Sequence, residues 1–413
     1  LEAGGPDDAP EIHAPQSWPT LWGTEVDWAY KTTAQEHTAS RIHDWPRGKV
    51  LGGTSSLNAM VYIRGHRTDF DAWAYEGNLG WDYESVLPLF RKMEDFEDGE
   101  SEYHGAGGPL HASSIHDPNP TSGVFVEACR EVGYPITDDF NGPRMEGAGW
   151  NHLVVKDNLR QSTAVACLKP VMDRPNLTVM TDAPVRRLLF EGGRCSGVEY
   201  VHEGGSVRAG VDGEVVLCAG AIDSPRLLML SGVGPAGELE RLGIPVAEDL
   251  PGVGENLHDH LLLGVVYEAS QPIPAPQANM SESALFWRGD PRRVGPDVQI
   301  AFIHVPFHSP EFTAPENSFT IAPGIVRPVS RGWVRLRSSD PDEKPEINPN
   351  YLAEEADVRG LLRGIEMSRE IGAADAFAEW RKGEALPGEE IQSESDLRDF
   401  VARAASTYYH PVG

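Results

Sequence analysis

The stretch from Arg47 to Gly65, RGKVLGGTSSLNAMVYIRG, combines residue types that could hold a flat cofactor. Gly52 and Gly53 permit close backbone approach, and small hydrogen-bonding side chains follow at positions 54–58. An apolar run, 59–63, comes next. This order matches an isoalloxazine ring, which is wide, mostly apolar and polar at one edge. A nicotinamide or a nucleotide phosphate could use some of the same groups.

Both ends of the chain carry side chains that suit cofactor binding or catalysis. LEAGG places Glu2 at the expected tip of a buried strand. In dinucleotide folds an acid at such a tip accepts hydrogen bonds from ribose hydroxyls, and a solvated acid in a turn is the alternative interpretation. YYHPVG holds His410 between bulky aromatics and a proline, which suits either a general base near neutral pH or a packed core histidine.

Other motifs favour ordinary structural roles. GVGPAG at 232–237 has the spacing of a dinucleotide fingerprint, but a helix is expected before it instead of a strand, so we interpret it as a helix-to-helix turn. HDH at 258–260 and HVPFH at 304–308 lack the helical context and the neighbouring carboxylates of a zinc site, so we expect hydrogen-bonding histidines and no metal. No G-x-S-x-G elbow supports a serine hydrolase.

Composition narrows the class of protein. A chain of 413 residues favours two interwoven domains, and its net charge of −28 argues against nucleic-acid or anionic-membrane partners. No apolar run reaches the roughly 18 residues of a transmembrane helix. Cys129, Cys167, Cys195 and Cys218 lie far apart, which suits a reducing compartment and a cytoplasmic location. Because the N-terminus looks missing, the sequence does not exclude a signal peptide.

Mixed α/β elements must position these residues. Capped helical patterns occur at 82–94, where the acid comes first, and at 121–133, where Thr121 or Ser122 would be the N-cap. A third helix, over 162–172, is interrupted by Pro170. Short β-rich runs with glycine turns fill 176–221 and end in EVVLCAG, which predicts a strand buried on both faces. SPRLLMLSG at 224–232 predicts a helix with Ser224 as cap. Residues 261–350 predict an antiparallel sheet, and helices return at 354–372 and 394–405.

Long segments of the chain resemble the glucose–methanol–choline (GMC) flavoprotein oxidoreductases. RGKVLGGTSSLNAMVYIRGHRTDFDAW is similar to their first signature, and GAIDSPRLLMLSGVGP (220–235) to their second. DLPGVGENLHDH (249–260) and the terminal YYHPVG follow in the expected order, so the likeness spans nearly the whole chain.

The resemblance implies a fold and a cofactor. A Rossmann-like, α/β FAD-binding domain would comprise 1–65 and 155–260, with the end near 406–413 returning to it. An α+β substrate domain built on an antiparallel sheet would comprise 66–154 and 261–405. Both ends look cut, so we expect the first strand, its glycine loop and a second active-site residue to be missing. The 413-residue chain alone would then bind FAD poorly and turn over little.

Site roles are carried over residue by residue. His410 would be the catalytic base, Glu2 would bind the adenosine ribose, and Val185 would meet the adenine through its backbone. The segment around Asn58 would line the flavin, and Ala219 and Gly220 would close the sheet near the cofactor. The flavin-lining residues are Gly52, Gly53, Asn58, Ala59, Met60 and Val61. Leu57 stands where some members attach FAD through a histidine, so we expect non-covalent FAD.

The implied reaction is oxidation of a primary or secondary alcohol to an aldehyde or ketone. His410 would take the hydroxyl proton while hydride passes to flavin N5, and oxygen or another acceptor would then reoxidise the flavin. The sequence does not specify which alcohol is the substrate, and a choline dehydrogenase-like activity is one of the interpretations. Tyr409, Trp287 and Phe286, with Glu282 or Asp297, are candidates for a choline cage, although core packing is the expected role of each aromatic residue taken alone. A hydroxynitrile-lyase-like enzyme and an inactive truncated fragment are the alternatives.

Overall fold

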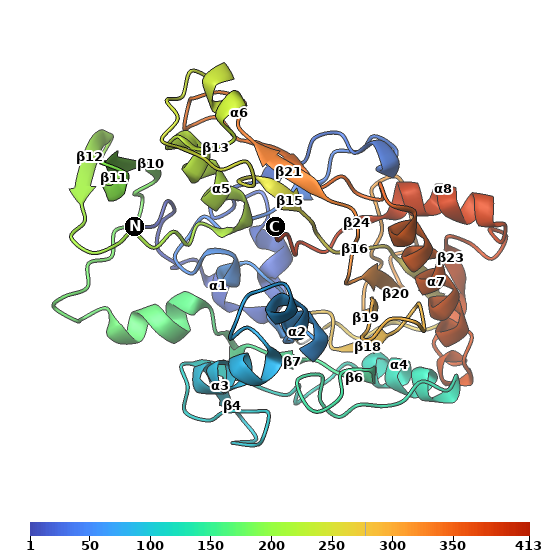
Figure 1. The fold of residues 1–413 in the computed structure, drawn as a ribbon. Helices are drawn as coiled ribbons and strands as arrows, with labels where there is room; N and C mark the ends of the chain where they lie inside the picture. The colour runs from blue at the N-terminus through green and yellow to red at the C-terminus, as the bar shows by residue number, and fades with distance from the viewer. Residues whose placement is uncertain (277) are drawn as a thin grey trace.

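The antiparallel sheet predicted over 261–350 is the largest element of the structure, a computed structural model that describes residues 1–276 and 278–413 (Figure 1). Its main path runs β23-β17-β20-β19-β18-β6, and β16 joins beside β20 and carries β24 on its other side. β6 comes from far earlier in the chain and pairs with β18. The strands are β6 Gly147–Trp150, β16 Leu261–Leu262, β17 Val265–Ala269, β18 Ser283–Trp287, β19 Val298–Ile303, β20 Ser318–Ile325, β23 Arg381–Leu386 and β24 Ser406–Thr407.

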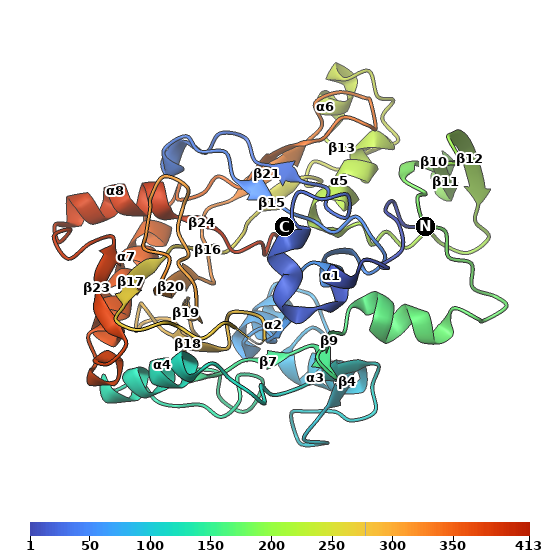
Figure 2. The same cartoon turned by 180° about the vertical axis from the view of Figure 1, so that it is seen from behind.

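Alternation along the strands gives this sheet two different faces. Val298, Ile300 and Phe302 of β19 belong to the main core, together with residues of α4 (Pro120–Glu131) and α7 (Glu355–Gly372). Figure 2 shows α7 beside β17 and β23, at one edge of the sheet. Ala301 of β19 points to the other face, where Leu262 and Ala322 pack with the partly buried Tyr408. The helices therefore cover one face, and the C-terminal stretch lies on the other.

The remaining helices are mostly short, and two of the predicted helices begin at a side-chain cap, the acidic one at 82–94 being the one that the sequence predicts. Asp82 caps α3 and Ser393 caps α8, each accepting a hydrogen bond from the backbone N–H three residues on. The helices are α1 Pro10–His13, α2 Arg67–Tyr75, α3 Tyr83–Met93, α5 Gly220–Leu230, α6 Ala236–Arg241 and α8 Glu394–Ala404. Single turns of 3₁₀ or π type cover Pro15–Leu21, Glu36–Thr38, Gly53–Ser56, Ala164–Leu168, Lys169–Val171 and Asp375–Phe377.

Smaller sheets surround these elements. The β-rich region 176–221 forms an antiparallel sheet of β10 Val185–Glu191, β11 Arg194–His202 and β12 Gly205–Gly210. GWVRLRS forms β21 Gly332–Arg335, which pairs with β15 Glu255–Leu257 and β22 Glu346–Asn348 in a sheet of its own. Paired short strands are β1 Tyr30–Lys31 with β2 Asp44–Trp45, β3 Val61–Tyr62 with β7 His152–Leu153, β4 Glu94–Phe96 with β5 Leu110–Ala112, β8 Val155–Lys156 with β9 Leu159–Arg160, and β13 Val233–Gly234 with β14 Glu248–Asp249.

Three predictions about elements are wrong. EVVLCAG is not a buried strand: residues 214–218 are irregular, and Val216 is 75% exposed. An apolar run forms a strand only where a neighbour completes the hydrogen-bond ladder, and none of the described residues pairs with this one. Asn119, one turn before the predicted caps, caps α4. α5 begins at Gly220 and not at Ser224, and Asp223 in its first turn accepts a hydrogen bond of 2.8 Å from the hydroxyl of Tyr30.

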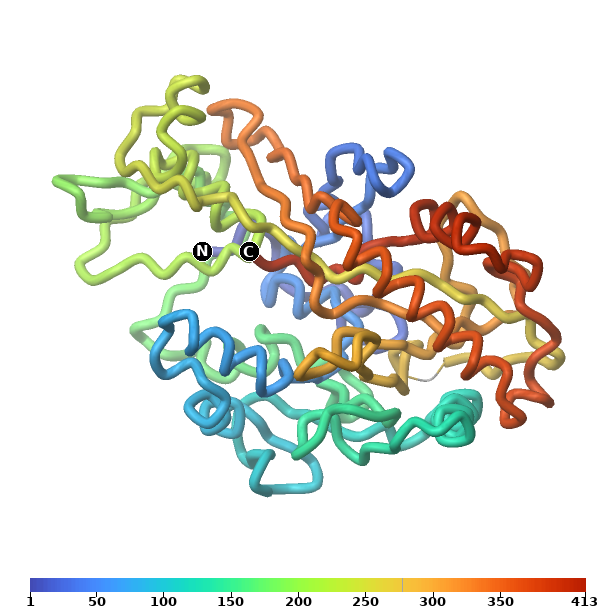
Figure 3. The backbone as a smooth tube through the Cα atoms, turned by 45° about the vertical axis from the view of Figure 1, so that its right-hand side comes forward, coloured from blue at the N-terminus to red at the C-terminus, as the bar shows by residue number. Residues whose placement is uncertain are grey.

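The C-terminal stretch crosses the molecule to reach the first signature. Figure 3 shows it leaving α8 and running back to the centre of the molecule. There Arg47 donates a hydrogen bond of 2.8 Å from Nη2 to the carbonyl of Tyr409. This hydrogen bond joins the start of the first signature to the C-terminal stretch.

Candidate functional site

Residues 47–61, which we call the ribbon, follow a path that favours glycine at two adjacent points. Gly52 and Gly53 have φ of +89° and +54°. A Cβ on Gly52 would lie 2.5 Å from Ser56 Oγ, whereas a Cβ on Gly53 would meet no atom within 4 Å. After the 3₁₀ turn, Met60 is fully buried and Val61 is 37% exposed. Backbone curvature and an exposed apolar side chain thus lie together in the ribbon.

A buried arginine fixes the shape of the ribbon from within. Arg160 Nη1 donates to the carbonyls of Ser55 and Asn58 at 3.1 and 2.6 Å and to Asn58 Oδ1 at 2.8 Å, while its Nε donates to the carbonyl of Ile12. Burial lowers the pKa of Arg160 to about 10, so the guanidinium stays charged at neutral pH. The side-chain oxygen of Asn58 is occupied, and its amide nitrogen is the group left for a ligand.

The segment Leu1–Gly5 lies between the ribbon and the strand that leads to Val185. Leu51 N donates to the carbonyl of Gly5 at 3.0 Å on one side, and Ala183 N donates to the carbonyl of Glu2 at 2.9 Å on the other. A Cβ on Gly4 would lie 1.9 Å from the carbonyl oxygen of Lys49, so this close approach requires glycine. Glu2 and Val185 therefore belong to neighbouring segments beside the ribbon.

Glu2 and the start of α5 also lie near each other. Glu2 is half-buried, and its Oε1 accepts a hydrogen bond of 2.8 Å from Gly4 N. Burial raises its pKa, and the carboxylate of Asp223 in α5 adds to the rise. Ala219 and Gly220 lie at the exposed beginning of α5, where Gly220 has φ of +79° and open space around it. The candidate cofactor residues thus cluster around one end of the ribbon.

These observations fit a dinucleotide with a flat ring. The open glycines, the exposed Val61 and the free amide nitrogen of Asn58 provide close approach, an apolar contact and a donor. Leu57 is buried in the cluster of Ile12, Leu21 and Val50, so no reactive group stands at that position. The arrangement suits a cofactor held by contacts instead of by a covalent bond.

His410 is fixed by three neighbours. Its Nδ1 lies 3.1 Å from Nδ1 of His260, its ring stacks on Tyr408 at 4.8 Å, and its backbone N–H donates to Asp259 at 2.7 Å. One flank of the ring is solvent-accessible, but protein packed around the rest, with His260 and Arg47, lowers the pKa to about 3. The imidazole is therefore neutral at physiological pH, the form that can accept a proton.

The residues proposed for a choline cage do not converge. Phe286 packs on Phe140, and Trp287 packs on Tyr134. Glu282 is fully buried and accepts hydrogen bonds from Asn119 N and Ser122 Oγ, and Asp297 accepts one from Gly289 N. Tyr409 alone lies at the site, with its ring 4.7 Å from that of Trp22. The cage interpretation is wrong because core packing and capping already use these groups.

Sequence reasoning missed several residues that shape the site. The sequence singles out Asp259 and His260 only within HDH and within a segment similar to the GMC family, and Arg47 only as a basic residue before the glycines. It gives no signal for Arg160. Nothing in a single sequence ties Asp259 to His410, since 151 residues separate them. The second histidine motif makes hydrogen bonds: His304 Nε2 lies 2.6 Å from Ser122 Oγ, and His308 Nδ1 lies 3.0 Å from the carbonyl of Ser309.

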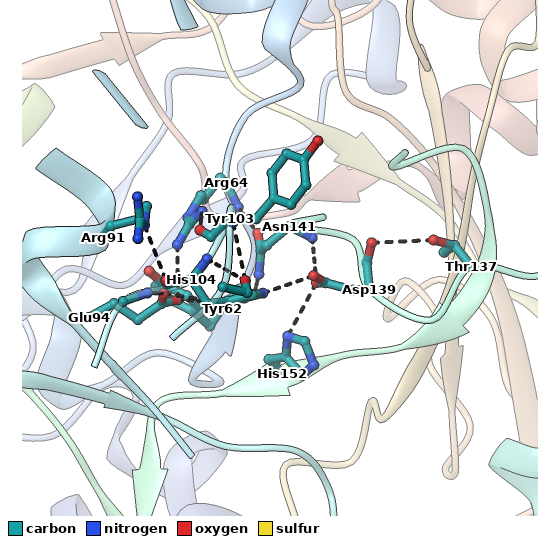
Figure 4. Close-up of polar contacts among 12 residues, drawn as sticks. Tyr62, Arg64, Arg91, Glu94, Tyr103, His104, Thr137, Asp139, Asn141 and His152 are labelled. Carbon is teal, nitrogen blue, oxygen red and sulfur yellow. Dashed lines mark hydrogen bonds and ion pairs between the residues drawn. The ribbon is translucent and has the colours of Figure 1, made fainter. Parts of the chain in front are cut away.

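A buried network of charges supports the far end of the first signature (Figure 4). His104 lies 3.1 Å from Glu94 and 2.8 Å from Asp139, and Arg64 Nη2 lies 3.0 Å from Glu94. Burial by itself would lower the pKa of His104, but its hydrogen bonds to Asp139 and Glu94 raise it to about 9. Two cations thus balance two anions.

Across residues 1–276 and 278–413, no helix is long and apolar enough to cross a bilayer.

Comparisons with known proteins agree with this arrangement. Two family models, both described as GMC oxidoreductase, match residues 30–262 and 328–413. Mitochondrial choline dehydrogenase of Mus musculus is 42% identical over 97% of this chain and 72% of its own length. "Alcohol dehydrogenase [acceptor]" of Pseudomonas putida is 37% identical over 100% of this chain and 80% of its own length. The structure of pyridoxine 4-oxidase from Mesorbium loti has a TM-score of 0.96 at 39% identity and covers 100% of this chain and 82% of its own.

Proposed function

Because the chain belongs to the GMC oxidoreductase family of FAD-dependent alcohol oxidoreductases, we propose that His410 is the base in the oxidation of an alcohol. The substrate would be a primary or secondary alcohol. Its hydroxyl proton passes to His410 while hydride leaves the carbinol carbon, and an aldehyde or ketone results. FAD, when bound, supplies the acceptor of the hydride at N5.

The observation that carries this proposal is the junction between the ribbon and the C-terminal stretch. Arg47 begins the ribbon and donates to the carbonyl of Tyr409, the residue before His410, at 2.8 Å. This contact supports the proposal that the neutral imidazole and the glycine-rich turn belong to one site. The lowered pKa of His410 leaves its imidazole unprotonated at neutral pH, which is the form that can accept the hydroxyl proton.

We propose that Glu2, Val185, Ala219 and Gly220 hold the adenosine half of FAD, and that the ribbon from Gly52 to Val61 holds the flavin. The hydrogen bonds that tie Leu1–Gly5 to both the ribbon and residues 180–183 support this assignment. The cofactor would be non-covalent, because Leu57 is buried and unreactive. Acid precipitation of the FAD-loaded protein should leave the flavin in the supernatant, and flavin that stays with the precipitate would contradict this.

The two-domain division is likewise part of the proposal. Residues 1–65 and 155–260, with 406–413, would bind FAD, and residues 66–154 and 261–405 would bind substrate. β6 supports it, because this strand from the earlier segment completes the sheet of the later one by pairing with β18.

For the substrate we propose an uncharged alcohol. The side chain that stacks on the ring of His410 is Tyr408, which is partly buried and packs with Phe307 over the buried Leu262, Ala301 and Ala322. Tyr409 and Trp22 would add an aromatic wall. Such a surface favours apolar groups on the carbinol carbon over a quaternary ammonium, which prefers an aromatic cage with a carboxylate.

Anaerobic mixing of the FAD-loaded protein with a panel of alcohols tests the function. Primary aliphatic or aryl alcohols should bleach the flavin with one equivalent of aldehyde formed, and choline should do so more slowly. A cyanohydrin is added to the panel, because a lyase would cleave it to an aldehyde or ketone and cyanide without bleaching the flavin. Absence of both bleaching and product with every alcohol would overturn the proposal. Admitting oxygen afterwards distinguishes direct reoxidation from the need for another acceptor.

A further inference from the structure

We propose that Asp259 is a positioning residue that holds the backbone of His410 in place, an inference that rests on the proposed role of His410 as base. The relevant geometry is a bulge. Tyr408 N donates to the carbonyl of His260 at 2.9 Å, and Val412 exchanges two hydrogen bonds with His258 at 2.7 and 2.9 Å. Residues 409–411 therefore lie opposite Asp259 alone, and the chain must bulge between these two fixed points.

The bulge cannot hold itself together by regular backbone pairing. Tyr409 has φ of +64°, a left-handed conformation that a bulky aromatic residue rarely adopts. Pro411 has no N–H to donate. A conformation of this kind persists only where surrounding groups fix it.

The buried carboxylate of Asp259 supplies that fixation. Its Oδ1 accepts the backbone N–H of His410 at 2.7 Å, and its Oδ2 accepts the hydroxyls of Thr407 and Tyr351, each at 2.5 Å. Asp259 is 3% exposed, so water cannot replace these contacts. A backbone N–H can only donate, and an oxygen at this point is therefore required.

The neighbours of Asp259 complete the clamp on the bulge. Thr407 Oγ1 accepts the backbone N–H of Tyr409 at 2.7 Å, and Arg47 donates to the Tyr409 carbonyl. Tyr351 in turn accepts a hydrogen bond of 3.0 Å from Nε1 of Trp45. The N–H and carbonyl of Tyr409 and the N–H of His410 are therefore all hydrogen-bonded. Asp259 accepts one of these N–H groups directly, and Thr407, which accepts the other, itself donates to Asp259.

Release of the bulge should move the imidazole. With Asp259 removed, Tyr409 can leave its left-handed conformation, and the ring of His410 loses its fixed distance from His260. A displacement of about 1 Å at a reacting group costs on the order of 100-fold in rate. We therefore expect Asp259→Ala to lower kcat about 100-fold with KM little changed. Asp259→Asn should lie between that variant and wild type, because its oxygen can still accept from His410.

The test combines kinetics with a signal from the imidazole itself, using FAD-loaded protein carrying ¹³C-labelled histidine. The His410 resonance is assigned by its loss in His410→Gln. Asp357→Asn is the matched control, because Asp357 is equally buried and accepts two backbone N–H groups of another segment, those of Val329 and Ser330. The resonance should shift and kcat should fall in Asp259→Ala, and both should stay unchanged in Asp357→Asn.

Two failures can be told apart. An unchanged His410 resonance in Asp259→Ala overturns the positioning role, whatever happens to the rate. Full activity of His410→Gln overturns the proposed base instead. If Asp259→Ala does not fold, Thr407→Val takes its place, because it removes one hydroxyl contact to Asp259 and the acceptor for Tyr409 N at almost constant volume. A shifted resonance with reduced kcat supports the clamp there too, and wild-type values overturn it.

Discussion

His410 shows how one side chain is prepared for proton transfer. Burial, with His260 and Arg47 nearby, lowers its pKa to about 3, so it stays neutral as the pH falls through the ordinary histidine value. We predict that kcat/KM for the alcohol has no acidic limb at the ordinary value near 6.5 and starts to fall only below it. Initial rates over a range of pH measure this. An acidic limb at or above neutrality would show that the imidazole is not held in its neutral form.

Gly52 and Gly53 make contrasting predictions although they are adjacent. A methyl group on Gly52 would combine φ of +89° with a contact of 2.5 Å to Ser56 Oγ. Gly52→Ala should cost about 1–3 kcal/mol of unfolding free energy and weaken FAD binding by at least about tenfold, because the ribbon must move. Gly53→Ala meets no atom and should cost less.

Urea unfolding and a flavin-fluorescence titration measure both effects. Gly237→Ala is the control, since this glycine lies in α6 with open space around its Cα and no positive φ. It should be neutral or slightly stabilising, as alanine favours helices. Equal behaviour of Gly52→Ala and Gly237→Ala would contradict the proposed backbone geometry.

Among the elements, the His104 network links the end of α3 to the loop that contains Asp139. His104 has a pKa of about 9 in the folded protein, above its unfolded value near 6.5. Its contribution to stability is therefore fully present below pH about 6.5 and is lost as the pH rises through about 9. We predict that His104→Gln lowers the unfolding free energy by about 3 kcal/mol at low pH and by much less above the folded pKa.

Urea unfolding of wild type and variant at both pH values tests the network. His116→Gln is the control, because His116 is also paired with a glutamate, Glu97, but is exposed. It should change the unfolding free energy little at either pH. A loss for His104→Gln that does not depend on pH would mean that packing alone, and not its ion pairs, accounts for the role of this side chain.

Some elements of the fold could be predicted from the sequence and others could not. The ribbon could be predicted because glycines and small polar residues state locally what the backbone does. The helices at 82–94 and 394–405 could be predicted because Asp82 and Ser393 are local caps. EVVLCAG could not, because a strand depends on a neighbour that its own residues do not specify. Asp259 could not either, because its role exists only once residues 409–411 lie opposite it.

At the scale of the whole molecule, buried neutral histidines set the response to acid. Burial lowers the pKa of His43, His260 and His304 to about 4, below the unfolded value of 6.5. The unfolded chain therefore binds more protons in this window, and stability falls as the pH drops from about 6.5 towards 4. We predict that the midpoint of urea unfolding decreases steadily over this range. A midpoint independent of pH would show that these rings are protonated in the folded protein.

The central claim is that the ribbon and His410 form one site for alcohol oxidation. The most direct measurement is the anaerobic rate of flavin reduction by the best alcohol in wild type, His410→Gln and the control His116→Gln, whose histidine is exposed and paired with Glu97. With FAD binding equal in all three, the rate should fall about 10²–10⁴-fold in His410→Gln alone. Equal rates in wild type and His410→Gln would contradict the account.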